Sequence, residues 1–106
     1  MAYQVTVIEP DGRSTVEALD KVPDNKWIKR RLEGGWLEVI PHFEQYGARP
    51  CVAFCDEEGK LKGLPLNPKA TYAWYTCLAP EPFRPDQLHG PIVIVTADTP
   101  EELEAL

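Results

Sequence analysis

The chain of 106 residues is 43% hydrophobic and 26% charged, and its formal net charge is −6, with a sequence pI near 4.8. This is the composition of a globular domain and argues against intrinsic disorder, while the negative charge disfavours a general nucleic-acid binder, because phosphate affinity comes mainly from lysine and arginine. The length suits one domain, residues 1–106, with room for one ligand site or one partner surface.

The amino terminus and the cysteines indicate the compartment. The first residues, MAYQVTVIEP, have neither the basic region nor the long apolar core of a signal peptide, and no apolar run has the length of a membrane span. We therefore expect a cytoplasmic protein whose three cysteines are reduced thiols. Cys51 and Cys55 would share one face of a strand about 13 Å apart, which is too far for a disulfide.

The first third of the chain predicts a hairpin and then a helix. Two alternating apolar runs over residues 3–19 flank Pro10-Asp11-Gly12, which is a strong hairpin signal. The spacing becomes helical in VPDNKWIKRRLEGG, where Asp24 is predicted to cap the helix and Gly34 or Gly35 to end it.

The middle of the chain returns to a strand pattern. Residues 36–44, WLEVIPHFE, predict a strand with one face made by Leu37, Val39 and Phe43 and the other by Trp36, Ile40 and His42. Residues 49–64, RPCVAFCDEEGKLKGL, predict a further strand, a turn at Glu57-Glu58-Gly59 and a brief return strand.

The last third adds two short helices around a strand. Asn67 is predicted to cap a helix over residues 66–78, with Pro68 at its first position, and residues 91–97, PIVIVTA, are apolar on both faces like a covered central strand. Thr99 is predicted to cap a carboxy-terminal helix. The elements together predict an α+β fold: a mixed sheet of about five strands, with one main helix on a face and short helices, resembling a β-grasp.

Four segments carry motifs that occur together in one family. They are Gly35–Val39, the turn Asp56–Leu61, the stretch Gly63–Thr71 with its Gly-Leu-Pro-Leu-Asn sequence, and the strand Gly90–Val95. This pattern resembles the domain of unknown function 3846, a family of short proteins from phages, plasmids and bacteria. The resemblance covers roughly residues 34–95, and the proline-rich stretch before Gly90 departs from it. The family name carries no activity, so the resemblance implies a setting of mobile elements rather than a reaction.

The stretch around Lys60, Lys62 and Asn67 has two interpretations. Each residue type can serve chain geometry alone: a tight turn at residues 56–59, a bend at Gly63 and a helix start at Asn67. Alternatively, the two lysines lie close to the amino end of the helix and form, with Asn67 and the free N–H groups, a pocket for an anion.

Arg31 also has two interpretations, because helical spacing places it on the same arc as Trp27, Ile28 and Leu32. Its stem could lie over Trp27 with the guanidinium in water. Alternatively, the guanidinium could sit at a buried edge and bind a carboxylate or a phosphate.

A surface contact is predicted at Trp36, Ile40 and His42 or in the proline-rich segment 79–90. The strand at residues 36–44 has apolar groups on both faces, so something must cover the second face. The carboxy-terminal helix could cover it through Leu103 and Leu106, or else a second copy in a homodimer or a host protein.

No catalytic or metal-binding pattern emerges. His42 and His89 lack the partners of a nucleophile relay, and no cysteine or histidine spacing indicates a metal, so we predict no catalytic residue, metal or cofactor. The leading hypothesis is a non-enzymatic interaction protein of a phage or mobile element that acts on a host or defence factor. The alternative is a binder of a small anionic, nucleotide-like ligand, and an enzyme is the weakest hypothesis. Neither general nucleic-acid binding nor a membrane partner is expected.

Overall fold

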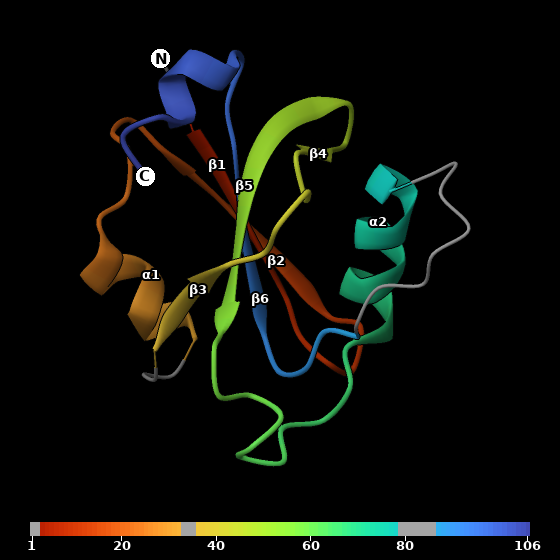
Figure 1. Cartoon of the computed structure of the whole chain (residues 1–106). Coiled ribbons are helices and arrows are strands. Elements are labelled where there is room, and N and C mark those ends of the chain that lie inside the picture. The colour runs from red at the N-terminus through yellow and green to blue at the C-terminus, as the bar shows by residue number, and fades with distance from the viewer. Residues whose placement is uncertain (1–2, 33–35, 79–86) are drawn as a thin grey trace.

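The sheet is the central feature of the protein (Figure 1). The computed structural model describes residues 3–32, 36–78 and 87–106. Six strands have the order β2-β1-β6-β5-β3, with β4 paired to β5 outside this path, and every strand pair in the described ranges is antiparallel. The strands are β1 (Tyr3–Ile8), β2 (Ser14–Leu19), β3 (Leu37–Val39), β4 (Gln45–Tyr46), β5 (Arg49–Asp56) and β6 (Ile92–Thr96).

The predicted amino-terminal hairpin is confirmed as β1 and β2. Gly12 has a φ of +94° in its turn, a conformation that glycine adopts without steric cost. The predicted helix after it is also confirmed, as α1 (Asn25–Arg31), and the Asp24 carboxylate accepts a hydrogen bond from the Trp27 N–H at 2.8 Å. The helix ends at Leu32, whereas Gly34 and Gly35 lie outside the described residues.

Helices lie on both faces of the sheet (Figure 1). Strand β6 is buried along its whole length, as its apolar run predicts: Ile92 and Ile94 pack with α2 (Pro68–Leu78), while Val93 and Val95 pack with α1 and η1 (Pro100–Leu103). The α+β class is therefore confirmed. The predicted mixed pairing is wrong, because every strand pair in the described residues is antiparallel. The longest helix, α2, lies on one face and the shorter α1 and η1 lie on the other. The β-grasp likeness is not confirmed.

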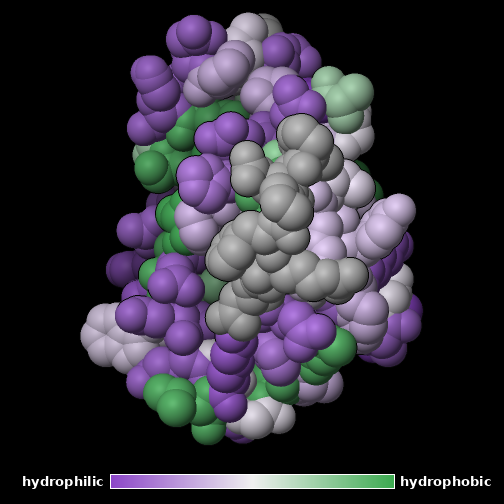
Figure 2. Space-filling model, turned by 45° about the vertical axis from the view of Figure 1, so that its right-hand side comes forward, coloured by the Kyte–Doolittle hydropathy of each residue, from purple (hydrophilic) through white to green (hydrophobic). Residues whose placement is uncertain are grey.

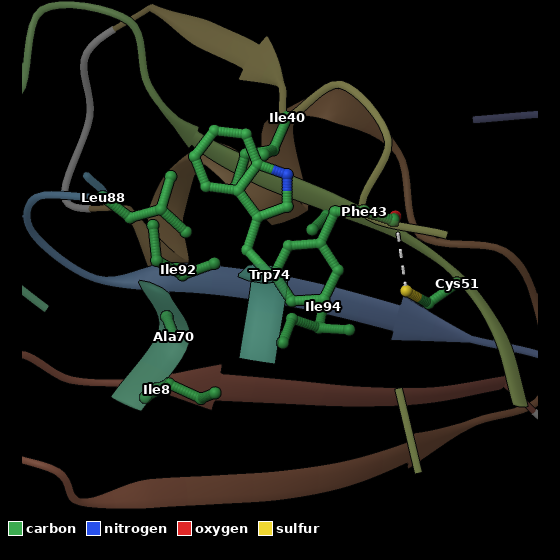
Figure 3. Packing of buried hydrophobic residues seen from close by; sticks show 10 residues of the cluster. Ile8, Ile40, Phe43, Cys51, Ala70, Trp74, Leu88, Ile92 and Ile94 are labelled. Carbon is green, nitrogen blue, oxygen red and sulfur yellow. Dashed lines mark hydrogen bonds between the residues drawn. The ribbon is translucent and has the colours of Figure 1, made fainter. Parts of the chain in front are cut away.

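The core on the α2 face is built around Trp74. Its indole lies between Ile40 and Leu88, and its Nε1–H donates to the Pro41 carbonyl at 2.8 Å (Figure 3). Phe43 lies in the same cluster, and its carbonyl accepts a hydrogen bond from the Cys51 thiol. This face is therefore closed by side chains of α2 and by Leu88.

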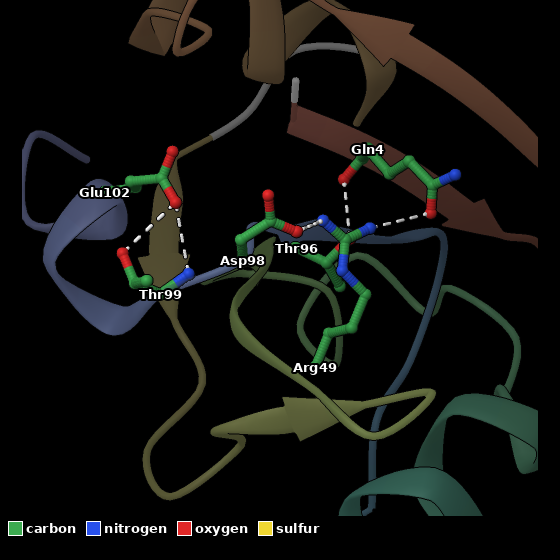
Figure 4. A network of polar contacts seen from close by, with 6 residues as sticks. All are labelled: Gln4, Arg49, Thr96, Asp98, Thr99 and Glu102. Atoms are coloured by element: carbon green, nitrogen blue, oxygen red, sulfur yellow. Dashed lines mark hydrogen bonds and ion pairs between the residues drawn. The ribbon is translucent and has the colours of Figure 1, made fainter. Parts of the chain in front are cut away.

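A polar network joins the start of β5 to β1 and to the end of β6 (Figure 4). The Arg49 guanidinium donates to Asp98 at 2.9 Å and to the Gln4 side chain at 3.2 Å. Next to it, Thr99 is the predicted cap position of the carboxy-terminal helix, which is the short 3₁₀ helix η1. Its N–H and its hydroxyl both donate to Glu102 Oε1 at 3.1 Å. These contacts hold the end of the sheet where β5 begins, opposite the end where Asp56 completes that strand.

The strand predicted over residues 36–44 is wrong beyond Val39. Ile40 still donates to the Ala53 carbonyl of β5, but the chain then turns at Pro41 and at His42, which has a φ of +65°. After this turn, Phe43 enters the same core cluster as Ile40, and the two side chains are 2% and 3% exposed. Ile40 and Phe43 therefore do not lie on opposite faces.

The return strand predicted after β5 is also absent from the described structure. Residues 57–63 form successive turns, and a single β-bridge joins Leu66 to His89 instead. In the three described ranges, no helix is both long and apolar enough to cross a membrane.

We predict that Gly90→Ala destabilises the protein by about 2 to 3 kcal/mol. Gly90 has a φ of +77°, and a Cβ there would lie 2.7 Å from Leu64 Cδ1, so the substitution adds a steric clash to backbone strain. Gly63→Ala is the matched control, because Gly63 has a φ of +71° with open space around it. Urea denaturation should give a loss of only about 1 kcal/mol for the control. Equal losses for the two variants would show that the clash is relieved without cost.

Candidate binding cleft

A cleft of about 320 Å³ opens where β3, the turn after β5, α2 and residues 87–89 meet. Its volume is at the lower end of the range of small-molecule sites, about 300–1,000 Å³. The lining residues are Glu38, Ile40, Pro41, Cys55, Asp56, Glu57, Gly59, Lys60, Trp74, Gln87, Leu88 and His89.

The floor of the cleft is apolar and fixed by the core. Ile40, Trp74 and Leu88 belong to the α2-face cluster, where the indole of Trp74 is held by its hydrogen bond to Pro41. The backbone N–H of Leu88 donates to the Thr71 hydroxyl at 2.9 Å, which ties this segment to α2. Since these groups are already packed, the floor is preformed for an apolar ligand group.

The rim carries carboxylates. Glu38 and Glu57 are exposed there, together with Lys60. Burial, followed by the nearby Glu38 carboxylate, raises the pKa of the Cys55 thiol to about 12. The thiol is therefore protonated at neutral pH, and it donates to Glu38 Oε1 at 3.6 Å. Cys55 is thus a poor nucleophile.

Asp56 closes the turn beside the cleft. Its side chain is 3% exposed and accepts hydrogen bonds from Lys62 Nζ at 2.8 Å and from the Glu58 N–H at 2.9 Å. Burial alone would raise the pKa of Asp56, but the hydrogen bonds from Lys62 and Glu58 outweigh burial and hold it below its usual value. The same bond to Asp56 raises the pKa of Lys62. The Asp56 carboxylate and the Lys62 ammonium group therefore stabilise the turn.

His89 lines the cleft with one ring nitrogen already engaged. Its Nδ1 lies 3.1 Å from the Leu64 carbonyl oxygen. A carbonyl oxygen can only accept, so Nδ1 carries the proton, and Nε2 is an acceptor whenever the ring is neutral. The histidine thus adds an acceptor to the cleft.

The structure does not assemble the predicted anion pocket from Lys60, Lys62 and Asn67. Lys60 lines the cleft and Lys62 pairs with Asp56, whereas Asn67 is 0% exposed and all its polar atoms serve the fold. The Asn67 amide Nδ2 donates to the carbonyls of Ile8 and Gly90, both at 2.9 Å, and Oδ1 accepts from the Ala70 N–H at 3.1 Å, which confirms the predicted cap. The structural interpretation of Asn67 therefore holds.

Arg31 lies on the other face of the protein, away from the cleft. Its guanidinium carbon is 3.9 Å from the centre of the Trp27 ring, and Nη2 bonds to Glu17 at 3.1 Å. The interpretation that Arg31 lies over Trp27 is confirmed, but the guanidinium itself covers the ring, where the interpretation placed the stem. Its guanidinium has a carboxylate partner within the chain.

The predicted contact surface of Trp36, Ile40 and His42 is divided by the fold. Ile40 is buried beneath Trp74 and Leu88, whereas Trp36 is 63% exposed and His42 is exposed in its turn. Lys29 Nζ lies 5.7 Å from the centre of the Trp36 ring. The second predicted surface, the proline-rich segment, lies outside the described residues over 79–86.

The cleft combines apolar, acidic and basic side chains from separate parts of the chain. Among the residues that the structure describes, no group of three histidine, cysteine or acidic side chains could hold a metal ion. Sequence reasoning missed the cleft itself, because its floor comes from Ile40, Trp74 and Leu88, which are distant in the chain and apolar. The Asp56–Leu61 motif was a usable signal, since part of that turn forms the rim.

Comparison with known proteins identifies one family. The model of the family described as "Domain of unknown function (DUF3846)" matches residues 3–106, essentially the whole chain. No curated protein and no solved structure matches the chain. The motif segments Asp56–Leu61, Gly63–Thr71 and Gly90–Val95 meet in space. The Leu64 N–H donates to the Gly59 carbonyl, Asn67 donates to the Gly90 carbonyl, and the Gly90 N–H donates to the Pro65 carbonyl. The motifs thus form one structural unit beside the cleft.

Proposed function

Since the chain belongs to the DUF3846 family, whose name carries no activity, we propose a role from its own geometry: a non-enzymatic interaction protein whose cleft holds part of a partner protein. The observation that carries this proposal is a preformed apolar floor next to an exposed edge of the sheet. In the setting of mobile elements that the resemblance implies, the partner is a host or defence protein.

The edge strand β3 supports a protein partner. It is the terminal strand of the sheet order in the described residues. The residue before it is tied to the cleft rim, because the Glu57 N–H donates to the Trp36 carbonyl at 2.8 Å. Trp36 and Val39 are both more than half exposed. Tryptophan is enriched among the residues that dominate binding energy, and a free strand edge offers backbone groups for pairing.

The surface visible in Figure 2 gives less support to a partner-binding site than the edge of β3 does. On the side of the molecule that comes forward in Figure 2, the coloured residues are mostly hydrophilic, with several hydrophobic areas between them.

The homodimer hypothesis also has less support, because it was based on an apolar face of residues 36–44 that needed a cover. The face that needed a cover is closed by Trp74 and Leu88, while Leu103 and Leu106 pack on the opposite face.

The anionic-ligand alternative has less support at this cleft. Glu38 and Glu57 stand at the rim, and two N–H groups of the first turn of α2, those of Ala70 and Thr71, already bond to Asn67. An enzyme has little support, because burial keeps the thiols of Cys51 and Cys55 protonated, each with a pKa of about 12.

A photo-crosslinking residue tests the proposal. Placed at position 57 in the cleft rim, it should trap a host protein that the same residue at position 72, on the exposed face of α2, does not trap. Trp36→Ala should weaken that complex by at least about tenfold, as truncation of a central aromatic does. Tyr72→Ala is the matched control, because Tyr72 is a comparably exposed aromatic on α2 outside the lining of the cleft. Trapping at position 72 alone, with no effect of Trp36→Ala, would contradict the proposal.

A further inference from the structure

We infer that the group held in the cleft is the side chain of a lysine or an arginine of the partner protein. This inference rests on the proposed function and adds the chemistry of the occupant. It depends on three features of the cleft: an apolar floor, a surplus of acceptors at the rim and a size that fits one long side chain.

The floor matches the stem of a basic residue. Lysine and arginine have apolar stems of several methylene groups that cover apolar surface while the charged head stays in a polar environment. Ile40, Trp74 and Leu88 provide such a surface, and the indole of Trp74 is fixed by its bond to Pro41. A cleft of about 320 Å³ holds a side chain of this size.

The rim of the cleft favours an occupant with hydrogen-bond donors. Glu38 and Glu57 contribute carboxylates, and neutral His89 contributes the acceptor Nε2, because its Nδ1 faces the Leu64 carbonyl. Ammonium and guanidinium groups have only donors, so they complement these acceptors. Lys60 is the lysine among the lining residues. Asp56 is paired with Lys62, and the two other lining carboxylates, Glu38 and Glu57, still outnumber Lys60.

The charge of the whole chain favours the same occupant. A net charge of −6 attracts a cationic partner over a range limited by salt screening. A phosphate or carboxylate would instead be repelled by the carboxylates of Glu38 and Glu57. The occupant is therefore cationic at its head and apolar along its stem.

A titration with four blocked amino acids tests the inference. The probes are N-acetyl methylamides of lysine, arginine, norleucine and glutamate, and the readout is the NMR signal of the Trp74 indole N–H, which borders the floor. We expect millimolar binding of the two cations, about threefold to fivefold tighter than norleucine, as for a charge pair at a partly exposed site. The preference should shrink as salt is raised.

Neutral variants assign the preference to the rim. Glu38→Gln with Glu57→Gln should reduce cation binding to the level of norleucine and leave norleucine binding unchanged. Glu101→Gln with Glu104→Gln is the control, because this variant removes the same two charges from exposed positions outside the lining. It should preserve the preference.

The outcomes separate the inference from the proposed function. Norleucine binding as tightly as lysine, or no probe moving the Trp74 signal, would overturn the cationic occupant, while crosslinking at position 57 would still support a protein partner. Tighter binding of the glutamate probe, or of adenosine monophosphate added as a further arm, would overturn the inference and favour the anionic-ligand alternative. A cation preference without any crosslinked protein would support the cleft chemistry and count against the proposed function.

Discussion

Asn67→Ala is expected to lower the free energy of unfolding by about 3 to 7 kcal/mol. The substitution removes two donors from buried carbonyls, those of Ile8 and Gly90, and the cap acceptor of the Ala70 N–H. Each buried group left without a partner costs about 1 to 3 kcal/mol, and the loss of a helix cap costs about 1 kcal/mol. Urea denaturation followed by circular dichroism measures the loss.

Two variants separate the cap from the buried bonds. Asp24→Ala removes an exposed cap at the start of α1 with no buried carbonyl attached, so it should cost only about 1 kcal/mol. Asn67→Asp keeps the acceptor for Ala70 but faces the two carbonyls with a carboxylate, so it should be at least as unstable as Asn67→Ala at neutral pH. A loss near 1 kcal/mol in Asn67→Ala would show that the two carbonyls find other partners.

Asn67 also shows what residue type reveals and what it conceals. An asparagine before a proline predicts a helix start, and the cap is present. The same amide joins β1 to Gly90 through backbone carbonyls, which carry no side-chain signal. The second role depends on how distant segments meet, so no local pattern contains it.

The same division holds for the strands and for Arg31. Local signals suffice for the β1–β2 hairpin, for the Asp24 cap and for the placement of Arg31 over Trp27, because the interacting groups lie close in sequence. The segment 36–44 failed because its apolar alternation continues through Pro41, while the left-handed conformation of His42 turns the chain. Nothing in the residue type of a histidine requires that conformation.

The candidate cleft could be predicted only in part. The sequence indicates a tight acidic turn at Asp56–Gly59 and presents Lys60 as a candidate ligand residue. The local pattern does not show that Lys62 pairs with Asp56 or that Glu38 joins the rim from another strand. Strand order decides which charges meet, and the pattern of one segment does not provide it.

A pair of substitutions tests how the fold divides the contact surface predicted from the sequence. Ile40→Asp is expected to unfold the protein, with a loss of more than about 4 kcal/mol, because it places a carboxylate beneath Trp74 and Leu88 without a partner. Trp36→Asp is expected to stay folded, within about 0.5 kcal/mol of the parent chain, since Trp36 is exposed at the sheet edge. Urea denaturation and solution mass measure both.

The comparison is informative because the two residues were predicted to share one exposed face. If Trp36→Asp folds but no longer forms the complex trapped at position 57, Trp36 contributes to binding without contributing to the core. If Trp36→Asp unfolds like Ile40→Asp, the aromatic packs more closely than its exposure indicates, and the edge of β3 is not available to a partner. A folded Ile40→Asp variant would contradict the closed α2 face, because a buried carboxylate without a partner is compatible with folding only if that face opens to water.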